Sequence, residues 1–435
     1  MSQVQRLPPV QHAHPAQQAQ PGQHSLPKDR IRVLLLEGVH ESAVDLFARA
    51  GYANVTRHKK ALDGQALLDA VAGVHIIGIR SRTQLTEAVF EAADRLLTVG
   101  CFCIGTNQVD LQAARMRAVP VFNAPFSNTR SVAELVIGEM VMLMRGIPGK
   151  SEAAHRGEWD KSALNSWEVR GKTLGIVGYG SIGSQLSVLA EAFGMRVLYH
   201  DTQDKLPHGN AQKAADLHDL LGRSDVVSLH VPESLATFGL IGEAEVRAMR
   251  PGGIFINNAR GTVVDLDAVA RALRDGHLLG AAIDVFPVEP ASNADRFTTP
   301  LQGLPNVILT PHVGGSTAEA QERIGAEVGR KLVDYSDIGA TWGAVNFPQV
   351  QLPPRPSGTR YMHVHRNVPG LLRRVNDVFS ARGLNIAAQY LQTEGDVGYV
   401  VVETDTRRHG GTAEDEALLD ELRAVEGTIR ARLLY

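Results

Sequence analysis

The chain has 435 residues, too many for one ordinary hydrophobic core, so two or three domains are expected. Its apolar share of 44% suits a globular protein, and a formal net charge of -3 gives no reason to expect nucleic acid or an anionic membrane as partner. No apolar run approaches the ~18 residues that a transmembrane helix needs.

The N-terminal residues 1–28 are rich in Gln, His and Pro and lack the apolar stretch of a signal peptide, which predicts a disordered tail. Its histidines, His12, His14 and His24, have no partner at metal-ligand spacing, so no metal site is predicted. The two cysteines, Cys101 and Cys103, are interpreted as reduced, buried side chains of a cytoplasmic protein.

From Ile31 onward, apolar strands alternate with short helices, which favours a parallel sheet covered on both faces. In chain order we predict strand 31–36, helix 42–50, strand 74–79, helix 86–94, strand 97–103, helix 109–117 and strand 119–123.

A long helix then interrupts the alternation. Ser131 and Glu134 have capping-box spacing at its start, and its body, Leu135–Leu143, is apolar almost all the way round. Such a helix must be buried on most sides, between domains or between subunits, and we interpret it as an indication of oligomerisation.

A second alternating series follows. We predict strands 174–177, 196–200, 225–231, 253–257, 281–285 and 307–310, and a helix 317–335 that returns to the first domain. The fold class is therefore α/β, with two doubly wound parallel sheets. The first domain covers 29–127 and 316–345, and the second, 128–315, is inserted into it.

Residues 346–358 contain four prolines and are predicted to form a stiff linker. Beyond it the order is strand, helix, strand, strand, helix, strand, which predicts a small ferredoxin-like βαββαβ domain over 359–435.

A dinucleotide site is predicted at the start of the second domain. Gly178, Gly180 and Gly183 form a G-x-G-x-x-G sequence between a strand and a helix, so the backbone there, with Ser181 and Ile182, offers free N–H groups to a pyrophosphate. The next strand ends at Asp201, 18 residues after Gly183. A carboxylate there accepts hydrogen bonds from a ribose diol and repels a 2′-phosphate, which favours NAD over NADP.

Three polar residues follow strands of the second domain, where ligands of open sheets bind. His312 is suited to exchange a proton near neutral pH, Glu289 to orient the imidazole and raise its pKa, and Arg260 to hold a substrate carboxylate. Together they predict hydride transfer at the carbinol carbon of a 2-hydroxy acid.

The segments around these residues, 257–265, 282–290 and 309–316, resemble the signatures of the D-2-hydroxyacid dehydrogenase family. The resemblance implies the same three roles, and contact of Asp284 with the nicotinamide amide. It also implies cofactor contacts from Asn258, Ala259, Gly314 and Gly315, although Asn258 departs from the small residue that is familiar there.

Arg80, Ser81 and Arg82 follow a strand of the first domain, and two arginines suit a dianionic group; Lys59, Lys60 and Lys161 add positive charge. The segments 78–82, 100–107 and 123–134 resemble family members of bacteria and fungi that oxidise 3-phosphoglycerate to 3-phosphohydroxypyruvate, the entry to serine synthesis. This implies phosphate binding by the arginines, with Asn128 near the substrate. Another hydroxy acid, reduction of 2-oxoglutarate, and an NAD-binding corepressor of the same fold stay open.

The C-terminal domain is similar to an ACT domain. The resemblance implies that His365, Asn367 and Asn385 bind serine as a feedback inhibitor, across two paired domains of a homodimer or homotetramer. Arg366 departs from the acidic residue that is familiar between the first two.

Overall fold

The computed structural model describes residues 26–290, 295–353, 358–405 and 413–434. Residues 1–25 of the predicted tail, with its three histidines, lie outside this part. Lys28 lies inside it, and its ammonium pairs with Asp337 of α11 (Ala318–Ile338) at 2.6 Å, so ordered structure begins before residue 29. Within the described ranges, no helix combines the length and apolarity needed to cross a bilayer.

The N-terminal sheet is parallel, with strand order β2-β1-β3-β4-β5. The sequence did not reveal β2, which is largely exposed and has no apolar run, nor α2, although α2 buries Leu67 and Val71. The elements are β1 (Arg32–Leu35), α1 (Glu41–Arg49), β2 (Asn54–Arg57), α2 (Gly64–Val71), β3 (Ile76–Ile79), α3 (Glu87–Ala92), β4 (Thr98–Cys101), α4 (Leu111–Met116) and β5 (Val121–Phe122).

The second sheet is also parallel, with strand order β12-β11-β10-β9-β6-β7-β8. The order reverses between β9 and β6, and a crevice for ligands forms at such a reversal. The elements are α6 (Ile147–His155), β6 (Thr173–Val177), α7 (Ser181–Ala192), β7 (Arg196–His200), β8 (Gln212–Lys213), α8 (Leu217–Arg223), β9 (Val226–Leu229), α9 (Glu243–Ala248), β10 (Gly253–Asn257), α10 (Leu266–Arg274), β11 (Leu278–Ile283) and β12 (Val307–Leu309).

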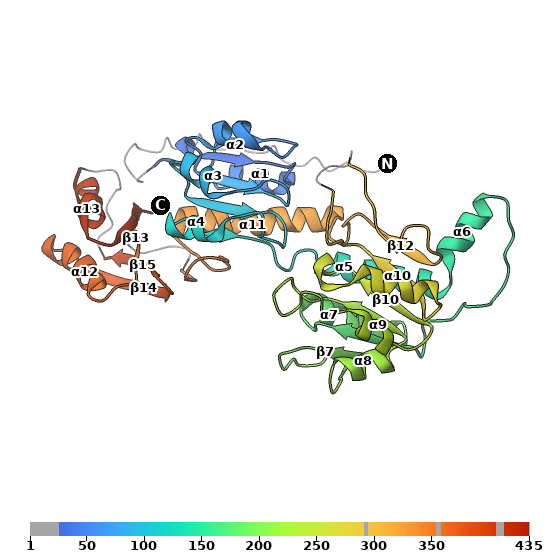
Figure 1. Ribbon diagram of the computed structural model, residues 1–435. Helices are drawn as coiled ribbons and strands as arrows, with labels where there is room; N and C mark the ends of the chain where they lie inside the picture. Colours follow the sequence, from blue (N-terminus) through green and yellow to red (C-terminus); the bar gives the residue numbers. More distant parts are fainter. Residues whose placement is uncertain (1–25, 291–294, 354–357, 406–412, 435) are drawn as a thin grey trace, which may run out of the picture.

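Two helices join the sheets (Figure 1): α5 (Thr129–Met144) leads into the second sheet, and α11 returns to pack on α1 and β4. The predicted capping box is wrong, because Asn128 is the N-cap, the Ser131 hydroxyl bonds to the Thr317 hydroxyl, and Glu134 pairs with Arg130. The apolar body of α5 is buried against α7 and the second sheet, so its burial is explained within one chain and gives no indication of oligomerisation.

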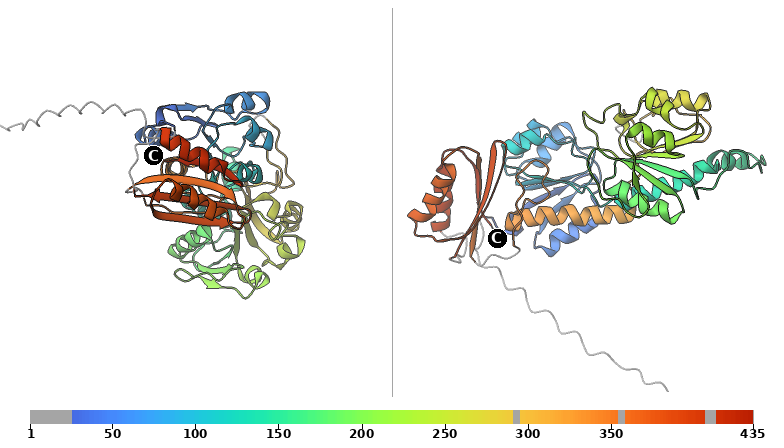
Figure 2. Two further views of the ribbon diagram at one scale, coloured as in Figure 1. Left: turned by 90° about the vertical axis from the view of Figure 1, so that its left-hand side faces the viewer. Right: turned by 90° about the horizontal axis from the view of Figure 1, so that it is seen from below.

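The C-terminal sheet is antiparallel in the order β14-β15-β13-β16, the ferredoxin-like arrangement predicted. One face carries α12 and α13, and the other packs on the end of α11, as Figure 2 shows. The elements are β13 (Thr359–Arg366), α12 (Leu371–Ala381), β14 (Ile386–Glu394), β15 (Val397–Thr404), α13 (Ala413–Ala424) and β16 (Thr428–Leu433).

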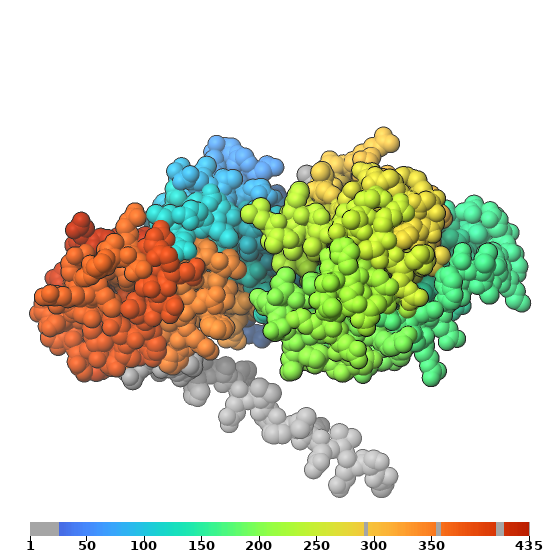
Figure 3. Space-filling view, turned by 60° about the horizontal axis from the view of Figure 1, so that its bottom comes forward, coloured from blue at the N-terminus to red at the C-terminus, as the bar shows by residue number. Residues whose placement is uncertain are grey.

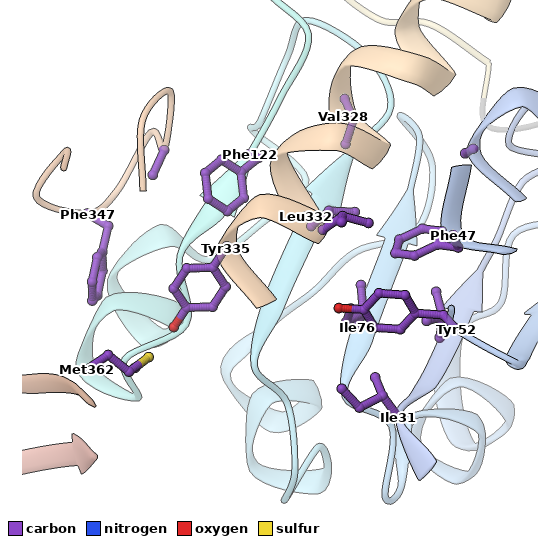
Figure 4. Close-up of a cluster of buried hydrophobic side chains, with 14 of the residues drawn as sticks. Ile31, Phe47, Tyr52, Ile76, Phe122, Val328, Leu332, Tyr335, Phe347 and Met362 are labelled. Carbon is purple, nitrogen blue, oxygen red and sulfur yellow. The ribbon is translucent and has the colours of Figure 1, made fainter. Parts of the chain in front are cut away.

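The predicted linker is in part a packed segment. Phe347 is buried with Tyr335 and Met362 in the cluster of Figure 4 and meets the Tyr399 ring edge-on at 5.6 Å. Val350 and Leu352 are buried too, because their apolar side chains pack in the same hydrophobic cluster although prolines stand on either side of them. Residues 354–357 lie outside the described part.

Candidate active site

The glycine turn between β6 and α7 provides both close packing and open space. A Cβ at Gly183 would lie 2.3 Å from the Gly178 carbonyl oxygen, whereas one at Gly180 would meet no atom within 4 Å. Asp201, at the end of β7, accepts hydrogen bonds from the backbone N–H groups of Tyr179 and Gln203, both at 2.8 Å. The turn therefore fits a pyrophosphate over Gly180, at the N-terminus of α7.

His312 and Glu289 lie together as predicted. The imidazole Nδ1 is 2.9 Å from Glu289 Oε2 and 3.1 Å from Oε1. This hydrogen bond, together with the carboxylate charge, outweighs burial and raises the pKa of His312. Burial alone would raise the pKa of Glu289, but the contact with His312 leaves it lowered. Because Nδ1 is occupied, Nε2 is the atom left for a substrate.

Asp284 shapes the turn that carries His312. Its carboxylate accepts hydrogen bonds from Thr310 Oγ1 (2.7 Å) and from the N–H groups of Val313 and Gly314 (both 2.8 Å). Its carbonyl accepts the His312 N–H at 2.8 Å, although His312 has a positive φ of 55°. A non-glycine residue in this conformation is held by its surroundings, so the turn is preorganised around Asp284.

Arg260 follows β10, and the side chain of Asn257 holds its loop. Asn257 donates to the Arg260 carbonyl (3.0 Å) and accepts from the Ala259 N–H (3.1 Å). Asn258, in contrast, points into the protein, where its amide donates to Glu139 Oε2 of α5 at 2.8 Å. Its side chain is buried at this contact, and the cofactor contact expected at this position stays a prediction.

The loop with Arg80, Ser81 and Arg82 is held by Glu37, which sequence reasoning missed. The Glu37 carboxylate accepts the backbone N–H groups of Arg80, Arg82 and Thr83 at 2.8–3.2 Å. The Glu37 N–H in turn donates to the Lys60 carbonyl, which brings the Lys59–Lys60 segment to the same edge. Glu37 directly follows the first strand, so the rule that ligands gather at strand ends would have revealed it.

The two halves face each other across a hollow at the surface, visible between the cyan and green parts of Figure 3. Cys103 lies against the Arg80 loop, with its thiol 3.5 Å from the Arg80 carbonyl. Burial raises the pKa of this thiol to about 11, and the charges of Arg80 and Arg260 act in the opposite direction. Cys103 also contacts Gln108 at 3.3 Å, so its surroundings are more polar than predicted. Asn128 meets Gly315, where a Cβ would lie 2.4 Å from Asn128 Nδ2.

Lys161 is not brought to this site within one chain. It is exposed in the segment after α6, which projects from the far side of the second sheet in Figure 1.

The three predicted effector residues do not converge within one chain either. His365 is buried beside His363, with Nδ1 atoms 3.2 Å apart, and Asn367 donates to the Gly395 carbonyl at 3.1 Å. Asn385 donates to Asp405 at the other end of the β14–β15 hairpin. The nine residues of β14 separate Asn367 from Asn385 by roughly 25 Å.

Comparisons with known proteins agree with this architecture. Residues 137–314 match the NAD-binding domain of D-isomer specific 2-hydroxyacid dehydrogenases, and residues 361–430 match an ACT domain like that of the AHAS small subunit. A solved D-lactate dehydrogenase from Aquifex aeolicus, complexed with NAD and lactic acid, is 27% identical, with a TM-score of 0.62 over 70% of this chain and 96% of its own.

The chain belongs to the D-isomer specific 2-hydroxyacid dehydrogenase family and is an NAD-binding oxidoreductase. Within that family it is similar to the D-3-phosphoglycerate dehydrogenases of Haemophilus influenzae (57% identical) and Escherichia coli K12 (56%). Each match covers 94% of this chain and 99% of the relative.

Proposed function

We propose that this chain oxidises 3-phospho-D-glycerate to 3-phosphohydroxypyruvate. The observation that supports this substrate is the Arg80–Arg82 loop, which follows β3 and which Glu37 holds through three backbone hydrogen bonds. Two guanidinium groups there suit a phosphate, while Arg260 suits the carboxylate of the same molecule.

In this reaction His312 Nε2 accepts the proton of the C2 hydroxyl as the C2 hydride leaves. Bound NAD supplies the hydride acceptor. Glu289 stabilises the imidazolium that forms, because its carboxylate already faces Nδ1. Arg260 holds the substrate carboxylate and polarises the forming carbonyl.

The test of the substrate is Arg80→Ala, assayed in the direction of reduction. We expect KM for phosphohydroxypyruvate to rise ~10- to 100-fold, as for the loss of a charge-assisted phosphate contact, while kinetics with glyoxylate stay unchanged. Arg95→Ala is the matched control, since Arg95 is a largely exposed arginine of the same half. An unchanged KM for phosphohydroxypyruvate would refute the phosphate assignment. Parallel assays with 2-oxoglutarate and pyruvate test the remaining oxo-acid substrates.

We also propose serine as effector and a homo-oligomer as the working form. Because Asn367 and Asn385 lie at opposite ends of β14, a serine site that uses both needs a second chain, and β14 is an edge strand with an unpaired side. The arm after α6 exposes Trp159 (89%) and Leu164 (78%), an apolar surface suited to a second copy. Light scattering with and without serine tests this, and a monomer under both conditions would contradict it.

A further inference from the structure

Glu139 lies where an ionised carboxylate is not expected. Its side chain is fully buried in α5, and among the described residues its Oε1 has no hydrogen-bond partner. The Oδ1 of Asn258 is likewise buried without a partner, although the two side chains already meet through Asn258 Nδ2 and Glu139 Oε2 at 2.8 Å. Each group therefore leaves one buried oxygen without a hydrogen bond, which destabilises the fold unless a proton joins the two groups.

One proton on Glu139, shared with Asn258 Oδ1, would satisfy both oxygens. A neutral carboxylic acid and a primary amide form a ring of two hydrogen bonds, in which the amide N–H donates to the acid carbonyl and the acid O–H donates to the amide oxygen. We propose that Glu139 is held as a neutral acid, paired in this way with Asn258, and that the pair is a positioning device for Arg260.

The charges around Glu139 agree with a bound proton. Of the elements packed against α5, β11 ends at Asp284, whose charge acts on Glu139. The Asp284 carboxylate itself accepts three hydrogen bonds, from Thr310, Val313 and Gly314. β10 contributes the neutral Asn257 and Asn258. The cluster around α5 also contains Leu186 and Ala190 from α7, Ile308 from β12 and the phenols of Tyr179 and Tyr199, while α6 has no buried residue. The Tyr179 hydroxyl bonds to Ser187. Burial first, and then Asp284, raise the pKa of Glu139 to about 8 against the opposing hydrogen bond from Asn258.

The link to Arg260 is short. The Asn257 side chain forms two hydrogen bonds within the 257–260 loop, and the Asn258 side chain bonds the same loop to Glu139 of α5. When Glu139 loses its proton, the acid O–H bond disappears and a second negative charge arises beside Asp284. The loop that presents Arg260 then loosens, and activity falls as pH rises through the pKa of Glu139. This role rests on the proposed function, whereas the protonation state of Glu139 does not.

Glu139→Gln tests the role, because glutamine keeps a donor for Asn258 Oδ1 and cannot ionise. In the direction of oxidation, we expect kcat/KM of the unmodified chain to fall roughly tenfold per pH unit above pH 8, as for loss of one proton. Glu139→Gln should match it at pH 7 and change less than about twofold up to pH 9. Asn258→Ala, which removes the tether, should be slower at every pH. An alkaline fall at the same pH in Glu139→Gln would overturn the role.

Thermal unfolding tests the proton without any substrate. Glu139 keeps its proton to about pH 8 in the folded chain but only to its ordinary value of 4.5 in the unfolded one, so stability is lost as pH rises between these values. We expect the Tm of Glu139→Gln, relative to the unmodified chain, to rise by several degrees from pH 5 to pH 8. Glu134→Gln, at an exposed position of the same helix, should show no such trend. A Tm difference independent of pH would overturn the protonated pair, whatever the activity.

Discussion

His312 shows how one residue depends on its immediate neighbours. Its backbone has a positive φ because Asp284 holds the turn on both sides, and its imidazole is oriented because Glu289 occupies Nδ1. The Asp284 carboxylate therefore shapes the backbone of the turn, whereas the Glu289 carboxylate raises the proton affinity of the imidazole. Removing the second should change the pH dependence of catalysis and leave the turn intact.

Glu289→Gln tests that separation. The Glu289 contact raises the pKa of His312, so its loss lowers that pKa. Oxidation needs a neutral imidazole, and the acid limb of kcat/KM should move to lower pH, with kcat reduced about 10- to 100-fold because the imidazolium loses its partner. Glu319→Gln, on the exposed first turn of α11, is the control. An unchanged acid limb would mean that Glu289 does not tune His312.

Residues at strand ends could be anticipated from sequence, whereas their buried partners could not. The predicted strands are followed by four of the site residues: Arg80, Arg260, Glu289 and His312. In the structure they lie after the carboxyl ends of β3, β10, β11 and β12. Glu139 lies in the middle of an apolar helix, 119 residues from Asn258. Its contact depends on how α5 crosses the second sheet, a three-dimensional arrangement that no local pattern carries.

At the scale of elements, the contact between β6 and α7 depends on the last glycine of the turn. Gly183→Ala would drive a methyl group against the Gly178 carbonyl at 2.3 Å and Ile176 at 2.9 Å, which forces α7 away from β6. We expect a loss of stability of ~1–3 kcal/mol, as for overpacking, and at least a tenfold weaker affinity for NADH.

Two further glycines separate these effects. Gly180→Ala meets no protein atom within 4 Å, so it should keep the stability and lose only NADH affinity, because its methyl group fills the space left for the pyrophosphate. Gly138→Ala, in open space on the exposed side of α5, should gain about 0.5–1 kcal/mol with unchanged affinity. Calorimetry and NADH titration measure both quantities, and equal NADH affinity in all three variants would contradict the cofactor site at this turn.

Strands with strong apolar runs were predicted from the sequence, whereas the helices α2 and α10 were missed although both bury apolar side chains. β1, β3, β6 and β10 are buried strands and were predicted within two residues. β2 and α6 bury almost nothing, so composition gave no signal. The capping box predicted from Ser131 and Glu134 is absent for another reason. The Ser131 hydroxyl bonds to Thr317 of the neighbouring chain segment and is therefore not available to cap α5.

At the scale of the molecule, the ACT-like sheet is joined to the first sheet by its hairpin turn. Arg115 of α4, only 15% exposed, lies 3.4 Å from Glu394 and 3.2 Å from Asp396. The same turn is bonded to Asn367, whose backbone N–H donates to the Asp396 carbonyl at 2.8 Å and whose side chain donates to Gly395. A proposed effector residue and α4 of the first half therefore both contact the turn 394–396.

Serine bound at Asn367 would shift this turn, and Arg115 would pass the shift to α4. Arg115→Ala should leave turnover without serine and the Kd for serine close to those of the unmodified chain, while inhibition at saturating serine weakens at least fivefold, within the ~1–3 kcal/mol typical of such coupling. Arg117→Ala is the control, because that neighbour pairs with Glu87 and Glu91 inside the first half.

Full inhibition of Arg115→Ala would place the coupling in other contacts, such as that of Arg432 with Ser336. Absence of serine binding in every variant would instead refute the effector assignment, so calorimetric titration of serine beside the activity assay distinguishes a broken connection from a missing ligand.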